Sequence, residues 1–414
     1  MRIALLLMSL LLVAPATATD FPRFRAVEVD KHAGEICYAV CVTDVDGDKK
    51  PDIVVATEDA VLWYANPSWE KHVIIKGATA RDNVCIQPHD IDGDGRIDFA
   101  LGAGWKPPDT TNPGTLQWLG RDAKGTWQVH PISFNEPSMH RLRWGDVLGN
   151  GKAQLVVAPL QGRGTKGPSW GDGPGVQIQV FSIPDDPNSP SWPVEVASNT
   201  LHTVHNLHIA DEYRPGEQDD IFVAAREGVF LLRRLAPGNW LTTSYAPAPG
   251  AEAAFRGAGE VRRGLLNRGK LRYIAAVEPF HGNQVVAYVF QGNGKGYLRQ
   301  VVDEPVTWAH ALWCADLDGD GNEDLIVGQR DPNPNGGKIP VGPGIWAYGA
   351  TLGALKNGVP ATAFARHDID DGGIAVEDLV AADLDADGRP EIVAVGRATH
   401  NVKIYWNQGK NARP

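Results

Sequence analysis

The sequence predicts an all-β fold, a seven-bladed β-propeller closed by an N-terminal strand, and three observations support this prediction. Its 414 residues include 46 glycines and 30 prolines, a turn-rich composition with few apolar repeats of helical period. One acidic loop recurs four times, and a short apolar strand follows it each time. Three weaker copies of the segment keep its spacing, so the chain divides into seven units of propeller-like length.

The chain opens with a segment typical of a secretory signal peptide. Arg2 precedes an apolar run at residues 3–13, and the small residues 16–18 resemble a cleavage site. The apolar run is too short to span a membrane as a helix. We therefore expect residues 1–18 to be removed, residues 19–414 to form one propeller, and the mature protein to be secreted or periplasmic.

The first unit shows the strand pattern expected of the others. Apolar runs predict strands at residues 37–43, 52–57, 61–64 and 70–75. The first residue of the acidic loop, or its equivalent, anchors the seven units at residues 44, 90, 146, 211, 264, 316 and 383. The seventh unit stops after a third strand at 402–406, whereas residues 24–29 precede the first unit and match the fourth-strand pattern. We therefore expect the N-terminal strand to complete the last blade and remove exposed sheet edges.

The four clear acidic loops place carboxylates at positions 1, 3, 5 and 9. Carboxylates in this spacing suit Ca²⁺, and the glycine at position 4 of three of the loops permits the tight turn. An EF-hand does not fit, because its last ligand falls at position 12 and helices flank its loop. We therefore expect several structural Ca²⁺ sites between first and second strands, with the ligands Asp44, Asp46, Asp48, Asp52, Asp90, Asp92, Asp94, Asp98, Asp316, Asp318, Asp320, Asp324, Asp383, Asp385, Asp387 and Glu391.

The pattern Asp-x-Asp-Gly-Asp-Gly before an apolar strand resembles the FG-GAP/VCBS repeats of integrin-type and bacterial propellers. The resemblance covers all seven units, four of them strongly, and implies a calcium-stiffened propeller. Long segments rich in His and Arg also resemble the sugar-active branch, which includes the propeller of aldos-2-ulose dehydratase and the propeller-type polysaccharide lyases. This second resemblance implies an enzyme that acts on carbohydrate.

Histidines recur at one register on the face opposite the acidic loops. His140, His205 and His310 each lie six residues before an anchor residue, and Tyr38 and Glu377 take the same register in the first and last units. Equivalent blade positions surround the central axis, so these side chains converge on one mouth. Three imidazoles beside a carboxylate suit Zn²⁺ or another divalent metal, or acid–base catalysis. Hydrogen-bonded histidines that pack between blades are the alternative.

Three long turns between second and third strands, at residues 102–114, 159–175 and 329–344, lie on this same face. Arginine pairs with carboxylate or sulfate and tryptophan stacks on sugar rings, so we expect these turns to bind substrate. The alternative is that their cationic residues only keep the loops soluble. Together with shorter turns, they supply the expected substrate-binding residues Arg163, Trp170, Arg226, His281, Arg330, Arg397 and His400.

The leading hypothesis for function is an exported lyase or dehydratase that eliminates across an acidic or oxidised sugar. His140 or His205 would act as the base, and Tyr38 or another histidine as the acid. Arg330, Arg163 or a histidine-bound metal would neutralise the carboxylate or carbonyl beside the carbon that loses its proton. The net charge of −11 argues against nucleic acid or an anionic membrane as partner.

Two other functions stay open at this point. One is a calcium-stiffened binding, adhesion or scaffold propeller without catalysis. The other is a glycoside hydrolase, which needs a carboxylate pair and has only Glu260, Glu377 and Asp378 as candidates on the cationic face. The sequence leaves open the particular sugar and the oligomeric state.

The four cysteines imply no disulfide framework. Cys37 and Cys41 lie on one expected strand, about 13 Å apart at the usual rise per residue, which is too far for a disulfide. The sequence assigns no role to them or to Cys85 and Cys314.

Overall fold

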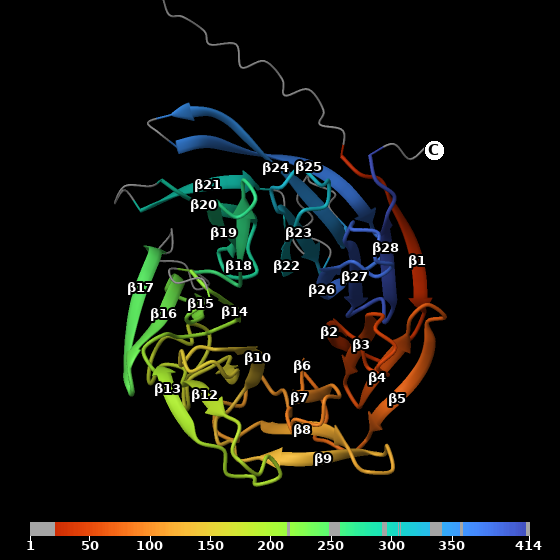
Figure 1. Cartoon of the computed structure of the whole chain (residues 1–414). Coiled ribbons are helices and arrows are strands. Elements are labelled where there is room, and N and C mark those ends of the chain that lie inside the picture. The colour runs from red at the N-terminus through yellow and green to blue at the C-terminus, as the bar shows by residue number, and fades with distance from the viewer. Residues whose placement is uncertain are drawn as a thin grey trace, which may run out of the picture.

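The computed structural model describes residues 21–212, 216–247, 257–291, 296–304, 306, 308–331, 342–356 and 359–410. These residues form seven four-stranded sheets arranged around a central axis, and they contain no helix (Figure 1). The predicted all-β, seven-bladed propeller is therefore confirmed. The expected signal segment, residues 1–18, lies outside the described residues.

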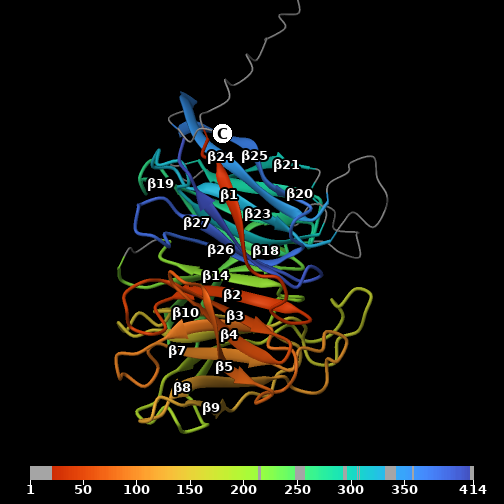
Figure 2. The ribbon, with the colours of Figure 1, turned by 90° about the vertical axis from the view of Figure 1, so that its right-hand side faces the viewer.

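Each blade runs from an innermost strand at the axis to an outer strand at the rim (Figures 1 and 2). In chain order the first six blades are β2–β5 (Cys37–Thr43, Asp52–Thr57, Ala60–Ala65, Glu70–Lys76), β6–β9 (Cys85–His89, Asp98–Ala103, Thr115–Arg121, Trp127–Ile132), β10–β13 (Met139–Gly145, Gln154–Pro159, Ile178–Ser182, Val194–Ser198), β14–β17 (Asn206–Ala210, Asp220–Ala225, Gly228–Ala236, Asn239–Pro247), β18–β21 (Glu260–Leu266, Leu271–Glu278, Gln284–Phe290, Tyr297–Asp303) and β22–β25 (Ala309–Ala315, Asp324–Gln329, Gly344–Lys356, Val359–Asp371).

The seventh sheet joins both ends of the chain. It contains β26 (Val376–Ala382), β27 (Glu391–Gly396) and β28 (Val402–Asn407), with β1 (Phe24–Asp30) as its outer strand. β1 pairs antiparallel with β28, from Phe24 opposite Asn407 to Asp30 opposite Val402. This pairing supplies β28 with the neighbour that it would otherwise lack.

The second strand of each blade packs against the neighbouring blades on both sides. Every residue of β3, β7, β11, β15, β23 and β27 is buried. Neighbouring blades cover both faces of such a strand, which explains why the sequence shows continuous apolar runs there rather than alternation. One apolar cluster, for example, contains Ile53 and Val55 of β3 together with Val393 and Val395 of β27.

Four innermost strands carry a β-bulge at the register where the sequence places histidine, tyrosine or glutamate. The pairing shifts at Tyr38 in β2, His140 in β10, His310 in β22 and Glu377 in β26. A bulge sets two consecutive residues opposite one partner and re-aims their side chains. As a result, His140 lines a cavity at one mouth of the axial channel, and the next residue, Arg141, lines a small cavity deeper in the channel.

Candidate functional site

A cavity of about 290 Å³ opens at the mouth of the axial channel opposite the acidic loops. The starts of the innermost strands contribute His140, His205, His310 and Glu377. Loops from several blades complete its wall with Trp105, Trp170, Arg226, Phe280, His281, Arg330 and Arg397. The three histidines at the starts of the innermost strands, His140, His205 and His310, thus converge on one mouth of the channel, as predicted.

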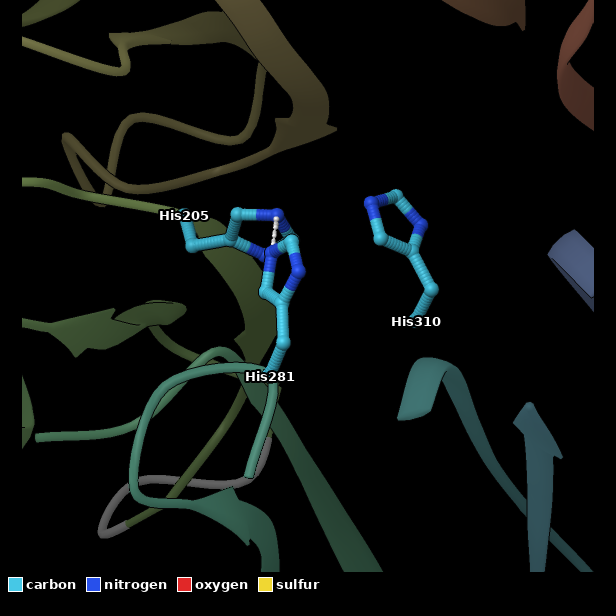
Figure 3. A group of neighbouring side chains, drawn as sticks. All are labelled: His205, His281 and His310. Atoms are coloured by element: carbon cyan, nitrogen blue, oxygen red, sulfur yellow. Dashed lines mark hydrogen bonds between the residues drawn. The ribbon is translucent and has the colours of Figure 1, made fainter. Parts of the chain in front are cut away.

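Four imidazoles gather in this cavity. The ring centroids of His140 and His205 lie 4.7 Å apart, and those of His205 and His310 lie 5.0 Å apart. His281 comes from the loop after β19 and brings its Nε2 within 2.7 Å of His205 Nε2 (Figure 3). Sequence reasoning named His281 as a substrate-binding residue, whereas its ring belongs to the histidine cluster itself.

Backbone carbonyls determine the tautomers of two of these rings. Nδ1 of His205 lies 2.8 Å from Gly259 O, and Nδ1 of His310 lies 2.8 Å from Glu377 O. A carbonyl oxygen can only accept, so both Nδ1 atoms carry the proton and donate it. The lone pair of each ring is therefore on Nε2, as is usual for histidines whose second nitrogen is oriented for metal binding.

The cluster fits a transition-metal ion. Ligand atoms of His205, His281 and His310 all lie within 4.8 Å of one another. Tetrahedral Zn²⁺ with Zn–N bonds of about 2.0–2.1 Å separates its nitrogen ligands by roughly 3.4 Å, a spacing that these rings reach with small movements. His281 Nδ1 is buried and has no hydrogen-bond partner among the described residues, so no hydrogen bond at this nitrogen opposes such a movement.

Burial keeps the imidazoles neutral. It lowers the pKa of His140, His281 and His310 well below the ordinary histidine value, and Arg141 or Arg330 lowers each of these pKa values further. Burial also lowers the pKa of His205, against the opposing effect of Glu260. A neutral ring has a lone pair for a metal ion or for a proton.

Two carboxylates stand behind the histidines. Glu260 Oε1 lies 3.1 Å from His205 Nδ1, and its other oxygen accepts a hydrogen bond from Asn206. Glu377 Oε1 accepts a hydrogen bond of 2.9 Å from Arg397, and its Oε2 lies 3.7 Å from Arg330. Both carboxylates are buried, and of the two only Glu377 lines the cavity.

Arginine and tryptophan side chains also lie in the cavity wall or beside it. The Arg330 guanidinium lies over the Trp308 ring and its Nε donates to Asp331. Trp105 stacks on His140 with ring centroids 4.6 Å apart, a contact that sequence reasoning did not anticipate. Trp170 stands on the long turn after β11 and also lines the cavity. The arrangement combines cations and flat apolar faces, which suits an acidic or oxidised sugar.

Strained backbone surrounds the same mouth. Trp170, Thr203 and Phe280, which line the cavity, and Trp308 beside it have φ angles of 52°, 44°, 49° and 58°. Residues with side chains rarely adopt this left-handed region, and such strain persists where the surrounding structure imposes it. The concentration of these residues at one mouth supports a functional role for it.

Three residues assigned to the site from sequence lie outside the wall of this cavity. Arg163 donates to the carbonyls of Thr111 and Asn135 and so ties loops together. Tyr38 donates to Asp82 at 3.0 Å and lines the small deeper cavity. His400 contacts the Glu35 carbonyl through Nδ1 at 2.6 Å. Each of these side chains makes a hydrogen bond within the protein and lies outside the cavity wall, because its loop or strand position does not bring it to the cavity.

The acidic loops lie at the other end of the innermost strands. Their clustered carboxylates are Asp44, Asp46 and Asp48; Asp90, Asp92 and Asp94; Asp316, Asp318 and Asp320; and Asp383, Asp385 and Glu391. The acid at position 9 is buried and accepts a backbone hydrogen bond from the loop, for example from Val45 to Asp52 and from Leu384 to Glu391. Position 9 therefore ties each loop to the second strand that follows it.

Comparison with known proteins agrees with the repeat pattern. The model of the family described as aldos-2-ulose dehydratase, beta-propeller domain, matches residues 112–291, and the model of the FG-GAP-like repeat matches residues 44–101. The predicted resemblance is confirmed. The first match contains His140, His205 and His281 of the cluster.

Aldos-2-ulose dehydratase of Phanerodontia chrysosporium is 28% identical to this chain over 257 residues, which cover 57% of the chain and 27% of that protein. The chain thus corresponds to about a quarter of this relative. No helix long and apolar enough to cross a membrane occurs among the residues that the structure describes.

Two solved structures share the fold. The crystal structure of BBS1N in complex with ARL6DN has a TM-score of 0.55 at 12% identity, and the match covers 96% of this chain and 99% of that one. The extracellular domain of the putative one-component system BT4673 from B. thetaiotaomicron has a TM-score of 0.51 at 12% identity, with coverage of 93% and 40%.

Proposed function

We propose that this protein is an exported, carbohydrate-active propeller that eliminates across an acidic or oxidised sugar in the histidine cavity. The convergence of four neutral imidazoles with Arg330, Arg397 and two tryptophans in one cavity carries the proposal. The similarity to aldos-2-ulose dehydratase supports a sugar-related propeller and a lyase or dehydratase reaction.

We assign the metal to His205, His281 and His310, with Zn²⁺ or another divalent cation as its identity. When bound, such an ion would supply Lewis acidity toward a sugar oxygen. His205 and His310 are held in the required tautomer by the carbonyls of Gly259 and Glu377. Structural Ca²⁺ in the acidic loops is a separate part of the proposal.

His140 is the base in this scheme. Its ring is neutral, lies beside the three proposed ligands and is held by the face of Trp105. Its lowered pKa makes it a weak base, so the carbon that loses the proton must be acidified by an adjacent carbonyl or carboxylate. Arg330 and Arg397 line the same cavity and would neutralise the charge that develops there.

The test is elimination from a panel of uronate-containing oligosaccharides and aldos-2-uloses, followed by ultraviolet absorbance of the unsaturated product, with divalent metals supplied. We expect His140→Ala to lower kcat by about 10²–10⁴-fold while metal content stays the same. His205→Ala, His281→Ala and His310→Ala should each lose bound metal, measured by elemental analysis, as well as activity.

His400→Ala is the matched control, because this histidine lies outside the cavity wall, and it should keep both metal and activity. Absence of product from every sugar would contradict the elimination chemistry. Saturable sugar binding without turnover would favour the alternative, a non-catalytic binding propeller.

A further inference from the structure

The axial channel has a second cavity at its other end, on the side of the acidic loops. Its volume is about 460 Å³, and residues from the later halves of the innermost strands line it. A cavity of only about 10 Å³, lined by Arg141, Arg143 and Asp378, lies between it and the histidine cavity. The two mouths of the channel therefore present separate chambers. The polar and aromatic residues important here are Arg143, Trp144, His208, Arg262, Trp313 and Asp378.

Two guanidinium groups in this cavity have no carboxylate partner within ion-pair distance among the described residues. Arg143 donates to the carbonyl of its own neighbour, Leu142. The guanidinium carbon of Arg262 lies over the Trp313 ring, 3.4 Å from its centroid, and Arg262 Nε is buried without a hydrogen-bond partner among the described residues. By contrast, Arg299 elsewhere in the fold pairs with Glu278 at 2.8 Å. Arg262 is buried and Arg143 half-buried, and a guanidinium group removed from water is unfavourable unless a ligand or a neighbour pairs with it.

Among the described residues that line the cavity, the one carboxylate, Asp378, is already engaged. Asp378 Oδ2 accepts from the amide of Val40 at 3.1 Å, and its Oδ1 accepts from the amide of Leu379 at 3.0 Å. Among the side chains that line the cavity, Asp378 therefore supplies one negative charge against the two positive charges of Arg143 and Arg262.

His208 contributes a donor rather than an acceptor. Its Nδ1 lies 3.0 Å from Arg262 Nη1, and a guanidinium can only donate, so Nδ1 accepts and the proton is on Nε2. Arg143, Arg262 and His208 consequently offer N–H groups to whatever fills the cavity. A cavity with such donors selects an oxyanion, because each oxygen of an oxyanion accepts several hydrogen bonds.

We propose that this second cavity binds a small oxyanion, such as phosphate, sulfate or the carboxylate of an acidic monosaccharide, through Arg143, Arg262 and His208. The site is distinct from the histidine cavity and uses none of its residues.

Isothermal titration of the calcium-loaded protein with inorganic phosphate, sulfate and glucuronate tests the proposal. We expect saturable 1:1 binding of at least one of them, at least tenfold weaker in Arg143→Gln and in Arg262→Gln, and unchanged in the control Arg25→Gln on the exposed outer strand β1. Preference for the inorganic anions over glucuronate would identify a free oxyanion as the ligand, and the reverse would identify an acidic sugar. Equal affinity in the cavity variants and the control, or no saturable binding of any of the three, would overturn the proposal.

A crystal soaked in selenate provides the second measurement, which does not depend on any variant folding. Anomalous signal between Arg143 and Arg262 is the expected result. Signal only at Arg330 and Arg397, or none in the channel, would contradict the site. Since the elimination assay reports on the histidine cavity alone, its failure leaves this outcome unaffected.

Discussion

At the scale of single residues, the candidate site depends on β-bulges. Alternation along a strand sends neighbouring side chains to opposite faces, so His140 and Arg141 would ordinarily not both line the channel. The bulge at His140 lets both residues line the channel, and the bulges at His310 and Glu377 likewise each bring one side chain to the cavity at the mouth. Bulges beside functional sites are built-in features of a fold rather than irregularities.

A residue-scale prediction concerns His208 and acid stability. Burial lowers its pKa well below the ordinary value of 6.5, and the charges of Arg262, Arg263 and Arg143 lower it further. Below about pH 6.5 the unfolded chain therefore binds a proton that the folded protein does not, so the contribution of His208 to stability is present above that pH and is lost as the pH falls.

We expect His208→Asn, which retains an acceptor for Arg262, to reduce the fall in Tm between about pH 7.5 and pH 5. Thermal unfolding in a buffer free of phosphate and sulfate measures this difference. His32→Asn is the control, because that side chain is 59% exposed and its replacement should leave the fall unchanged. An identical fall in wild type and His208→Asn would contradict the assignment.

At the scale of elements, the acidic loop is a turn that organises itself around its own carboxylates. Asp44 accepts from the amides of Gly47 and Lys49, and Asp52 ties the loop to β3 and to Asn66. The degenerate loop of the third blade keeps this arrangement without a complete acid set, because Gln154 takes the position of Asp52 and accepts from Leu148. The loop of the third blade thus keeps the turn geometry although it lacks the complete set of carboxylates.

The matching prediction is that calcium binds only where the cluster is complete. Asp92→Asn should remove about one bound Ca²⁺ per chain, whereas Asp146→Asn in the degenerate loop should remove none. Chelation should lower Tm, because each site contributes about 2.7 kcal/mol when calcium is at 100 times its Kd. Equilibrium dialysis with calorimetry measures both quantities. Equal calcium counts in Asp92→Asn and wild type would contradict the assignment of that loop.

At the scale of the whole molecule, the two ends of the chain meet in one blade. β1 pairs with β28 from Phe24 to Asp30, with one register shift after Glu28, and Asp30 also accepts a hydrogen bond from Tyr64 of the first blade at 2.7 Å. The strand β1 therefore has two roles: it completes the sheet of the last blade, and it connects that blade to the first one.

Removing residues 21–30 should destabilise the ring and expose the edge of β28. We expect Tm to fall by about 5 °C or more, since each kcal/mol lost shifts Tm by only a few degrees in a protein of this size. Thermal unfolding and size-exclusion chromatography provide the measurement, with aggregation through the open edge as the accompanying result. A truncated protein with the Tm of wild type would show that β1 adds no stability.

Much of the architecture was predictable because it repeats. The expected strands at 37–43 and 52–57 coincide with β2 and β3, and those at 61–64, 70–75, 24–29 and 402–406 extend by a residue or two into β4, β5, β1 and β28. Burial on both faces produces a continuous apolar run, which is a signal that depends only on local sequence.

The candidate site was predictable only in part. The shared register of His140, His205 and His310 follows from the repeat, so their convergence could be deduced from sequence. The part played by His281 could not, because a loop residue has no register and its direction depends on tertiary contacts such as its 2.7 Å contact with His205. The same holds for Arg163, which resembled a substrate arginine but donates to loop carbonyls.

The sequence by itself thus determined seven blades, their acidic turns and the face on which histidine recurs, because each of these is repeated along the chain and needs no knowledge of distant contacts. Only the tertiary structure decided which side chains meet. It brought His281 and Trp105 into the cluster, paired Arg397 with Glu377, and left Arg262 without a carboxylate at the opposite mouth. These contacts join residues far apart in sequence, and their geometry depends on bulges and loop paths that no local pattern records.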